Sequence, residues 1–219
     1  MIFMYTNFSS VLYYMQRIFI KIKLTNGSFT IFVKKGCGFM PLPKGTQYTT
    51  EFIYNLPEGE RAELIDGQIY YMAPPSREHQ KLIMNLSATI HNYINSKSGL
   101  CEVYPAPFAV FLNKDDKTYV EPDISVICDK SKLDDKGCVG APDWIIEIVS
   151  PSSIRHDYLT KAHLYETTKV REYWIVDIDK QRITVHNFEN QTLEEFSFSD
   201  IVKAGIYEDL YINFRDIAK

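Results

Sequence analysis

Two acidic side chains and one lysine stand where they could hydrolyse a phosphodiester bond. Asp123 opens one apolar run, Glu147 lies inside another, and Lys161 follows on a predicted helix. Since an isolated charge in a core is strongly unfavourable, Glu147 must be paired, protonated or bound to a cation. A divalent cation between two carboxylates keeps both ionised, and a nearby ammonium can orient its water. Hard oxygen ligands favour Mg²⁺ or Mn²⁺.

A structural explanation of the same residues stays open. Glu147 and Lys161 could form a plain buried ion pair, with Asp123 only ending a strand after Pro122. The order acid, acid, lysine on strand, strand and helix favours the metal site.

Strands must bring the two acids together. Apolar runs predict strands over residues 101–112, 119–128 and 143–149. Because alternate residues of a strand share a face, Asp123 groups with Glu121, and Glu147 groups with Ile145. The acids meet if these strands are neighbours.

Two helices should flank these strands. Ser76 begins a helix that lasts until Gly99 and turns His79 inward. Ser152 or Ser153 can cap a second helix, on which Lys161 and Tyr165 share the sheet-facing stripe.

Further elements complete the predicted domain. Asp66-Gly67 predicts a hairpin turn between residues 63–65 and 69–72, and a second hairpin is expected over residues 172–186. A short helix capped by Thr49 precedes them, and the loop over residues 134–140 is expected to lack strands.

Several motifs together resemble the Uma-two family of endonucleases, within the restriction-endonuclease-like PD-(D/E)XK superfamily. They are Glu63-Leu64-Ile65-Asp66-Gly67, Pro74-Pro75-Ser76, His79, Glu121-Pro122-Asp123, Glu147-Ile148-Val149-Ser150-Pro151-Ser152, Asp157, Lys161, Tyr165 and Glu172-Tyr173-Trp174-Ile175-Val176-Asp177. The resemblance implies an α/β (α+β) fold, with a restriction-endonuclease-like central mixed sheet flanked by helices.

The resemblance also implies roles for single residues. Asp123 matches the first acid and Glu147 the second, both expected to hold Mg²⁺ (or Mn²⁺) together with the Ile148 carbonyl. Glu63 matches an upstream acid that assists the metal or its water. These residues and Lys161 form the predicted catalytic set.

One departure concerns the lysine. Val149 stands where the superfamily normally has it, and the family pattern moves the ammonium to Lys161 on the next helix. The expected supporting residues are Glu121, His79, Asp157 and Tyr165. His79 is equally explained as a core histidine, Asp157 as a helical partner of Lys161, and Tyr165 as a packing residue.

Composition limits the classes of function. The net charge is −4 and the pI about 5.8, so no global basic field draws the chain onto phosphate backbones. P-loop, G-x-S-x-G, G-x-G-x-x-G and HExxH motifs are absent, which argues against NTPases, acyl hydrolases, dinucleotide enzymes and zinc proteases.

The cysteines and the apolar runs indicate the cellular compartment expected for the protein. The four cysteines form no CxxC pair, which predicts reduced thiols. No signal-peptide pattern and no run long enough to span a bilayer are present, so a cytoplasmic location without a membrane partner is the default.

Residues 1–39 differ from the rest and are expected to be an extension of a domain over residues 40–219. Lys34-Lys35-Gly36 can be encoded by a purine-rich tract just before Met40, where a ribosome-binding site would lie, so translation could begin at Met40. A short hairpin turning at Asn26-Gly27 is the alternative.

The sequence thus predicts a Mg²⁺-dependent endonuclease that cleaves DNA through a metal-activated water. The alternative is a catalytically inactive module of the same fold that binds nucleic acid or protein. A homodimer is possible, with the aromatic segment over residues 207–211 as an interface or as core.

Overall fold

The computed structural model describes residues 18–25, 28–35, 47–113, 115–149 and 156–218. The chain divides between residues 38 and 39 into two units, and each is considered by itself. In the first, β1 (Ile18–Thr25) pairs antiparallel with β2 (Ser28–Lys35), as the hairpin alternative requires. The Asn26-Gly27 turn lies outside the described residues, and the start at Met40 stays a prediction.

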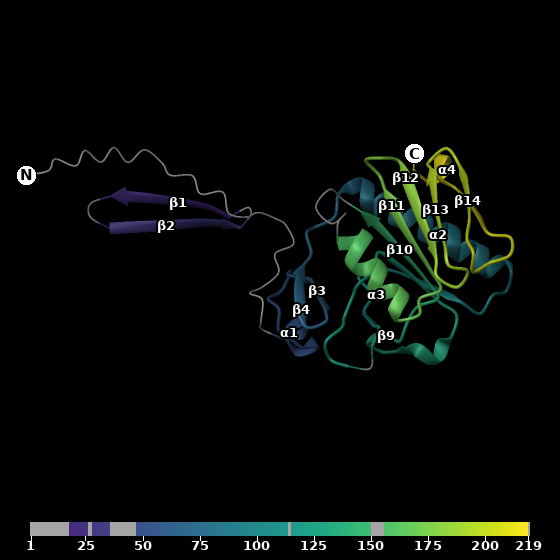
Figure 1. The fold of residues 1–219 in the computed structure, drawn as a ribbon, viewed down its shortest axis with the longest axis horizontal. Coiled ribbons are helices and arrows are strands. Elements are labelled where there is room, and N and C mark those ends of the chain that lie inside the picture. The colour runs from purple at the N-terminus through teal and green to yellow at the C-terminus, as the bar shows by residue number, and fades with distance from the viewer. Residues whose placement is uncertain (1–17, 26–27, 36–46, 114, 150–155, 219) are drawn as a thin grey trace, which may run out of the picture. The chain divides into compact units, whose positions relative to one another are not determined.

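A six-stranded mixed sheet forms the centre of the second unit (Figure 1). Its strands in spatial order are β13 (Thr192–Ser197), β12 (Arg182–Asn187), β11 (Glu172–Asp177), β10 (Trp144–Val149), β7 (Ile124–Ile127) and β5 (Glu102–Pro105). Only β10 and β11 run parallel; the other neighbours are antiparallel. The predicted mixed sheet is confirmed, and the two acid-bearing segments are neighbours.

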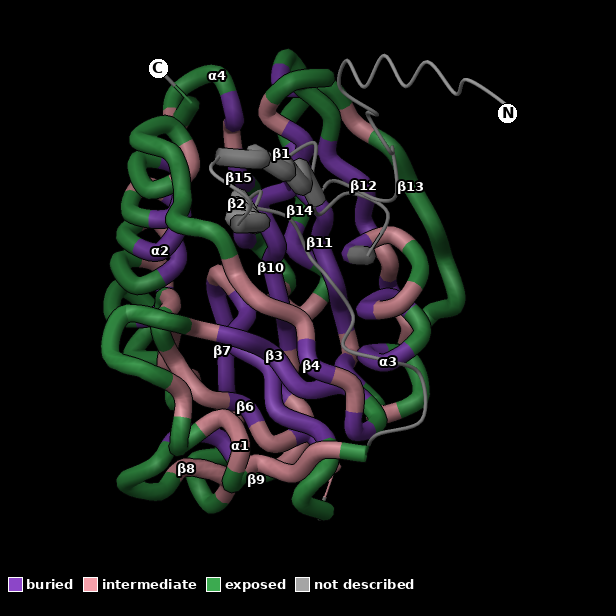
Figure 2. The backbone as a smooth tube through the Cα atoms, turned by 90° about the vertical axis from the view of Figure 1, so that its left-hand side faces the viewer, coloured by how far each residue is buried: buried purple, intermediate pink, exposed green. Residues whose placement is uncertain are grey.

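Helices cover both faces of this sheet, as Figure 2 shows with α2 and α3 on opposite sides. The first face packs Trp144, Ile146 and Ile148 of β10 against α2 (Arg77–Ser96). The second face packs Ile145 and Val149 against α3 (Ala162–Thr167), which continues the π-helix η2 (His156–Lys161). Glu147 therefore points to the α3 side, as the alternation predicted.

The ends of the helices follow from local chemistry. The Ser76 side chain accepts a hydrogen bond from the His79 amide at 3.2 Å, so it is the N-cap of α2. Thr49 precedes α1 (Thr50–Tyr54), but its side chain makes no capping bond. The predicted caps Ser152 and Ser153 lie outside the described residues.

The predicted Asp66-Gly67 turn joins β3 (Ala62–Ile65) to β4 (Gln68–Tyr71). Both turn residues have positive φ, 49° and 73°, which the two-residue turns of twisted hairpins require. This hairpin packs with Phe52 of α1 and with Tyr119 into a small separate core. Glu63 lies on β3, the first strand of this hairpin.

Several strands are shorter than expected. The segment 101–112 divides into β5 and β6 (Val110–Phe111), because Pro105 and Pro107 cannot donate to a ladder. Tyr119 and Val120 form only isolated bridges before β7. The loop over residues 134–140 contributes to two short strands, β8 (Leu133–Asp134) and β9 (Gly137–Val139), contrary to the expectation of an irregular connection.

The prediction of reduced thiols was wrong for two cysteines. Cys101 and Cys128 form a disulfide between the ends of β5 and β7. Since Glu102 is opposite Ile127, these cysteines are the next opposed pair of the ladder. Cys138 is a buried free thiol, and burial raises its pKa to about 11. Cys37 lies outside the described residues.

The C-terminal region returns over the α2 side of the sheet. It contains β14 (Ile201–Lys203), β15 (Tyr211–Asn213) and α4 (Phe214–Ile217), and η1 (Lys130–Lys132) lies in the loop after β7. The buried Glu172 carboxylate accepts a hydrogen bond from the Ile206 amide at 2.9 Å and ties this region to β11. Leu210 is buried, whereas Tyr211 is exposed, so the segment 207–211 is partly core.

The two tryptophans of the chain lie on neighbouring strands of the sheet. Trp144 of β10 and Trp174 of β11 are both fully buried, and their rings meet edge to face with centroids 4.8 Å apart. Among the described residues, none of the helices has the length and apolar composition to cross a membrane.

Candidate active site

The register of two strands brings Asp123 to the end of β10. Ile124, the first residue of β7, pairs with Ile146, so Asp123 lies beside Glu147 and Ile148. The Ile148 amide donates to Oδ2 of Asp123 at 2.7 Å, and the Asp123 amide lies 3.5 Å from Oε2 of Glu147. The two predicted acids are therefore neighbours in space.

Lys161 completes the predicted convergence. Its Nζ lies 2.8 Å from Oε1 of Glu147, 2.9 Å from Oε1 of Glu63 and 3.6 Å from Oδ1 of Asp157. The lysine side chain is only 4 % exposed, and its helix has a π-type turn, a feature frequent at functional sites. Three carboxylates thus surround one buried ammonium.

Glu63 enters the site from the β3–β4 hairpin. Its Oε1 accepts from Lys161 and from the amide of Glu121 at 3.1 Å. Its Oε2 is fully buried and has no hydrogen-bond partner among the described residues. A buried carboxylate oxygen without a donor indicates that water or a cation belongs beside it.

Two tyrosine hydroxyls donate hydrogen bonds to residues of the cluster. The Tyr165 hydroxyl donates to Oε1 of Glu147 at 2.9 Å, and the Tyr173 hydroxyl donates to the backbone carbonyl of Asp157 at 3.1 Å. Their rings pack edge to face with centroids 4.8 Å apart. Tyr165 is therefore a hydrogen-bond partner of a predicted metal ligand as well as a core residue.

The supporting residue Glu121 points away from this cluster. Its carboxylate accepts from Arg61, with Nε at 2.8 Å, and from the Tyr119 hydroxyl, while only its amide reaches Glu63. Sequence reasoning missed Arg61, which has no distinctive spacing from Glu121. Their contact depends on the bridge between Leu64 and Tyr119, a long-range pairing.

His79 reaches the site from the first turn of α2. Its Nε2 lies 3.1 Å from Oδ2 of Asp123, and the imidazole also hydrogen-bonds to the backbone of Ile148. Burial lowers the pKa of His79, but the contacts with Asp123 and Ile148 raise it by more, so the net shift is upward.

The site carries more negative than positive groups. Glu63, Asp123, Glu147 and Asp157 face one lysine and one histidine. Burial raises the pKa of Glu147 well above its ordinary value; Lys161 opposes this, and the neighbouring acids add to it. Burial lowers the pKa of Lys161, but Glu147, Glu63 and Asp157 raise it by more, so the amine stays protonated.

The donor set suits a hard divalent cation. In each of three acids, one carboxylate oxygen accepts a hydrogen bond from a protein donor. The other oxygen has no close donor among the described residues; these oxygens are Oδ1 of Asp123, Oε2 of Glu147 and Oε2 of Glu63. Among the described residues, no group of three or more His, Cys, Asp or Glu side chains is placed so that it could hold a metal ion by itself. Mg²⁺ typically uses one or two carboxylates and completes its shell with water and phosphate.

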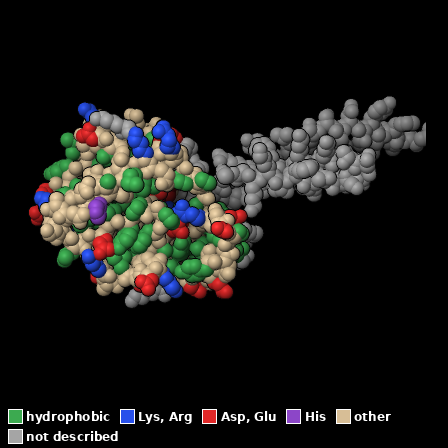
Figure 3. All heavy atoms as spheres, turned by 180° about the vertical axis from the view of Figure 1, so that it is seen from behind, with side chains coloured by type: hydrophobic (Ala, Val, Ile, Leu, Met, Phe, Trp, Pro, Cys, Tyr) green, Lys and Arg blue, Asp and Glu red, His purple; other side chains and the backbone are tan. Residues whose placement is uncertain are grey.

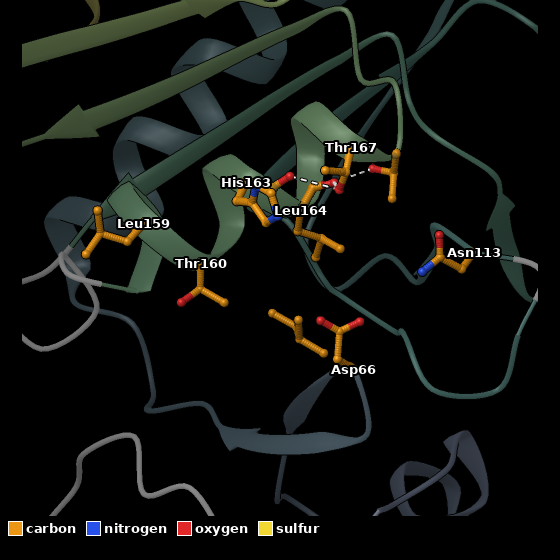
Figure 4. Close-up of a pocket in the computed structure, with 9 residues that line it drawn as sticks. Asp66, Asn113, Leu159, Thr160, His163, Leu164 and Thr167 are labelled. Carbon is orange, nitrogen blue, oxygen red and sulfur yellow. Dashed lines mark hydrogen bonds between the residues drawn. The ribbon is translucent and has the colours of Figure 1, made fainter.

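A hollow of about 480 Å³ lies beside the helix that carries Lys161 (Figure 4). Asp66 from the hairpin turn faces Thr160, His163 and Thr167 across it, with Asn113 at one side. None of the predicted catalytic residues lines it. The candidate site is therefore the buried acidic cluster and not this hollow.

The surface shows no concentration of basic groups on the face in Figure 3, where described acidic and basic side chains are interspersed. Lys97 pairs with Asp209. Lys81 is exposed.

Three of the remaining histidines have described side chains, and their contacts lie outside the acidic cluster. His91 hydrogen-bonds Asn95, His163 lines the hollow, and His186 stacks on Tyr173. The side chain of His156 is not described.

Comparison with known proteins gives one family. The model of the Uma2 family, described as "Putative restriction endonuclease", matches residues 49–205, which include every predicted site residue.

Two relatives are similar to this chain in sequence. Two uncharacterized proteins of Synechocystis sp. (strain ATCC 27184 / PCC 6803 / Kazusa), slr1290 and sll1609, are 27% and 29% identical over 129 and 121 residues. These matches cover 58% and 54% of this chain and 66% and 67% of the relatives, so the chain spans just under two thirds of slr1290.

The structural match supports the fold. A crystal structure from Anabaena variabilis ATCC 29413, described as a "putative nuclease belonging to DUF820", superimposes with a TM-score of 0.64 at 20% identity. The match covers 78% of this chain and 97% of that one.

Proposed function

Because the chain belongs to the Uma2 family, described as "Putative restriction endonuclease", we propose that it hydrolyses phosphodiester bonds in DNA with Mg²⁺ or Mn²⁺. The single observation that carries this proposal is the buried cluster in which Asp123, Glu147 and Glu63 converge with Lys161. An ion pair would need one acid for one lysine. The surplus of carboxylates is what a divalent cation would neutralise.

The chain's own residues would share the reaction. Asp123 and Glu147, with the Ile148 carbonyl, would hold the cation, which when bound polarises the phosphodiester and acidifies a water. Oε2 of Glu63, which has no hydrogen-bond partner among the described residues, would accept a proton of that water. The Lys161 ammonium would stabilise negative charge on the phosphoryl oxygens. To do so it would give up its longest contact, with Asp157, for a contact with the phosphate.

A nicking assay tests this function. Supercoiled plasmid is incubated with wild type, Asp123→Asn and Glu147→Gln in Mg²⁺, in Mn²⁺ and in EDTA, with single-stranded DNA and RNA in parallel. We expect cleavage of DNA by wild type with either cation, none in EDTA, and a loss of at least about 100-fold in both variants.

Asp129→Asn is the matched control, because Asp129 is an exposed aspartate outside the cluster that only orders Ser131. It should cleave like wild type. Activity that survives both site variants would come from a contaminant or another site, and would refute the assignment.

One observation favours the alternative, an inactive binding module. Each hydrogen of the Lys161 ammonium can face one carboxylate, as in a purely structural ion network. Calorimetric titration with Mn²⁺ separates the two functions. The nuclease requires uptake that Glu147→Gln abolishes, whereas the structural network requires none.

The proposal includes a cytoplasmic location and a homodimer that would cut both strands. The Cys101–Cys128 pair weighs against a reducing compartment. Tyr211 and Ile201, exposed on the paired strands β14 and β15, are candidates for an interface. Light scattering of the purified protein tests the assembly: a monomeric mass at assay concentration would remove the dimer.

A further inference from the structure

His79 lies where it can control the geometry of Asp123. As the third residue of the 20-residue helix α2, it is held by regular backbone, and its side chain is only 15% exposed. Its Nε2 is 3.1 Å from Oδ2 of Asp123, the same oxygen that the Ile148 amide approaches at 2.7 Å. Two donors from different elements thus meet one carboxylate oxygen.

In the neutral imidazole of His79 the proton is on Nε2. This nitrogen lies 3.1 Å from Oδ2 of Asp123, whereas Nδ1 is buried without a partner among the described residues. A buried N–H without an acceptor is unfavourable, so the Nε2–H form is preferred. A histidine that ligates a metal usually donates its other N–H to a partner, and Nδ1 of His79 has none within the part of the chain that the structure describes.

We propose that His79 is a positioning residue, which with the Ile148 amide fixes Oδ2 of Asp123 and leaves Oδ1 as the oxygen that binds the cation. The inference rests on the proposed function, because it assumes that Asp123 binds a divalent cation.

Glu147 shows the same arrangement. Lys161 and the Tyr165 hydroxyl both donate to its Oε1, while its Oε2 lies next to the Asp123 amide at the longer distance of 3.5 Å. In both acids two donors restrict rotation of the carboxylate. A ligand held in one orientation loses less conformational entropy when the cation binds.

Mn²⁺ binding, followed by electron paramagnetic resonance, tests this role. His79→Leu removes the donor, and His79→Gln restores an N–H near the position of Nε2. We expect His79→Leu to weaken Mn²⁺ binding about 10–100-fold, and His79→Gln to recover most of that loss. Melting and near-ultraviolet circular dichroism show whether each variant is folded.

The spectrum of wild-type protein adds a test that needs no variant. A positioning residue gives no nitrogen coupling to bound Mn²⁺, so a nitrogen coupling that His79→Leu removes would overturn the inference in favour of direct ligation. Unchanged Mn²⁺ affinity in folded His79→Leu, or Gln no better than Leu, would also overturn it.

Asp123→Asn distinguishes this inference from the proposed function. If wild type binds Mn²⁺, Asp123→Asn does not, and His79→Leu binds normally, only the role of His79 fails. If wild type takes up no Mn²⁺, the proposed function and this inference fail together.

Discussion

Lys161 has carboxylates on three sides and almost no contact with solvent. Its ammonium holds together side chains from β3, β10 and η2, three elements distant in sequence. Whether or not Lys161 takes part in hydrolysis, the acids depend on it for their burial, because each would otherwise be an unpaired charge in the interior.

Replacing this lysine should therefore destabilise the protein. We expect Lys161→Met to lower the free energy of unfolding by about 3–5 kcal/mol near neutral pH, since it leaves buried charges without a partner. At pH 5 the loss should be smaller, because burial raises the pKa of the Glu147 carboxyl and lets it take up a proton. Urea denaturation at both pH values measures the effect.

Lys180→Met is the control for charge and size. Lys180 pairs with Asp177 but its side chain is 57% exposed, so its removal should change stability by no more than about 1 kcal/mol. Equal losses in the two variants would contradict the structural role of Lys161.

The pKa of Glu147 gives a pH dependence of defined sign. Burial raises this pKa above the ordinary 4.5, so the folded state binds the proton more tightly than the unfolded chain does. The associated stability is present below pH 4.5 and lost as pH rises through the raised value. Between pH 4.5 and the raised pKa, the free energy of unfolding of wild type in EDTA should therefore fall relative to that of Glu147→Gln.

Urea titrations of both proteins between pH 4.5 and 8 provide the measurement. Parallel curves would mean that Glu147 is ionised throughout. If the cation binds as proposed, Mn²⁺ at pH 8 should stabilise wild type and leave Glu147→Gln unchanged.

At the scale of elements, local patterns predicted what depends on neighbours in sequence. Apolar alternation placed Glu147 on one face of its strand, helical spacing turned Lys161 inward, and Asp66-Gly67 marked a turn. Long-range register was not accessible in this way. The contact of Glu121 with Arg61 and the pairing of Cys101 with Cys128 depend on which strands are neighbours.

The same limit explains the short strands and the π-helix. β9 forms because Gly137 and Cys138 lie beside Ala109 and Val110, a contact that only the folded chain provides. The π-type turn at residues 156–161 has no recognised sequence signal, yet it lies where Asp157 and Lys161 face each other.

The disulfide predicts a redox effect on the edge of the sheet. It closes a segment with a sequence separation of 27 residues and joins β5 to β7, the strand that follows Asp123. We expect a reductant to lower the free energy of unfolding of wild type by about 2–4 kcal/mol. Urea denaturation with and without dithiothreitol measures the difference.

The double variant Cys101→Ala/Cys128→Ala is the control. It should resemble the reduced wild type and should not respond to dithiothreitol. A response of equal size in the variant would assign the effect to another thiol, such as Cys37 or Cys138.

At the scale of the whole molecule, charge opposes binding of DNA to the bare protein. The net charge is −4, and the candidate site is itself acidic. A phosphate would be repelled there unless a cation is bound first. We therefore expect a duplex to bind at least about tenfold more tightly in Ca²⁺ than in EDTA.

Fluorescence anisotropy with labelled duplex measures this difference, because Ca²⁺ often supports binding without turnover. Glu147→Gln should show a smaller gain and Asp129→Asn the wild-type gain. Equal affinities of wild type in Ca²⁺ and EDTA would indicate a binding surface elsewhere on the molecule.

The paired tryptophans offer an optical probe of whether β10 and β11 remain paired. Their indole rings lie edge to face on β10 and β11, and β10 also carries Glu147. Because both indoles are rigidly packed in the core, they should give a near-ultraviolet circular dichroism signal that vanishes when the two strands separate. Because the chain has no other indole, unlabelled protein can report whether the strand beneath the acids is intact in every variant.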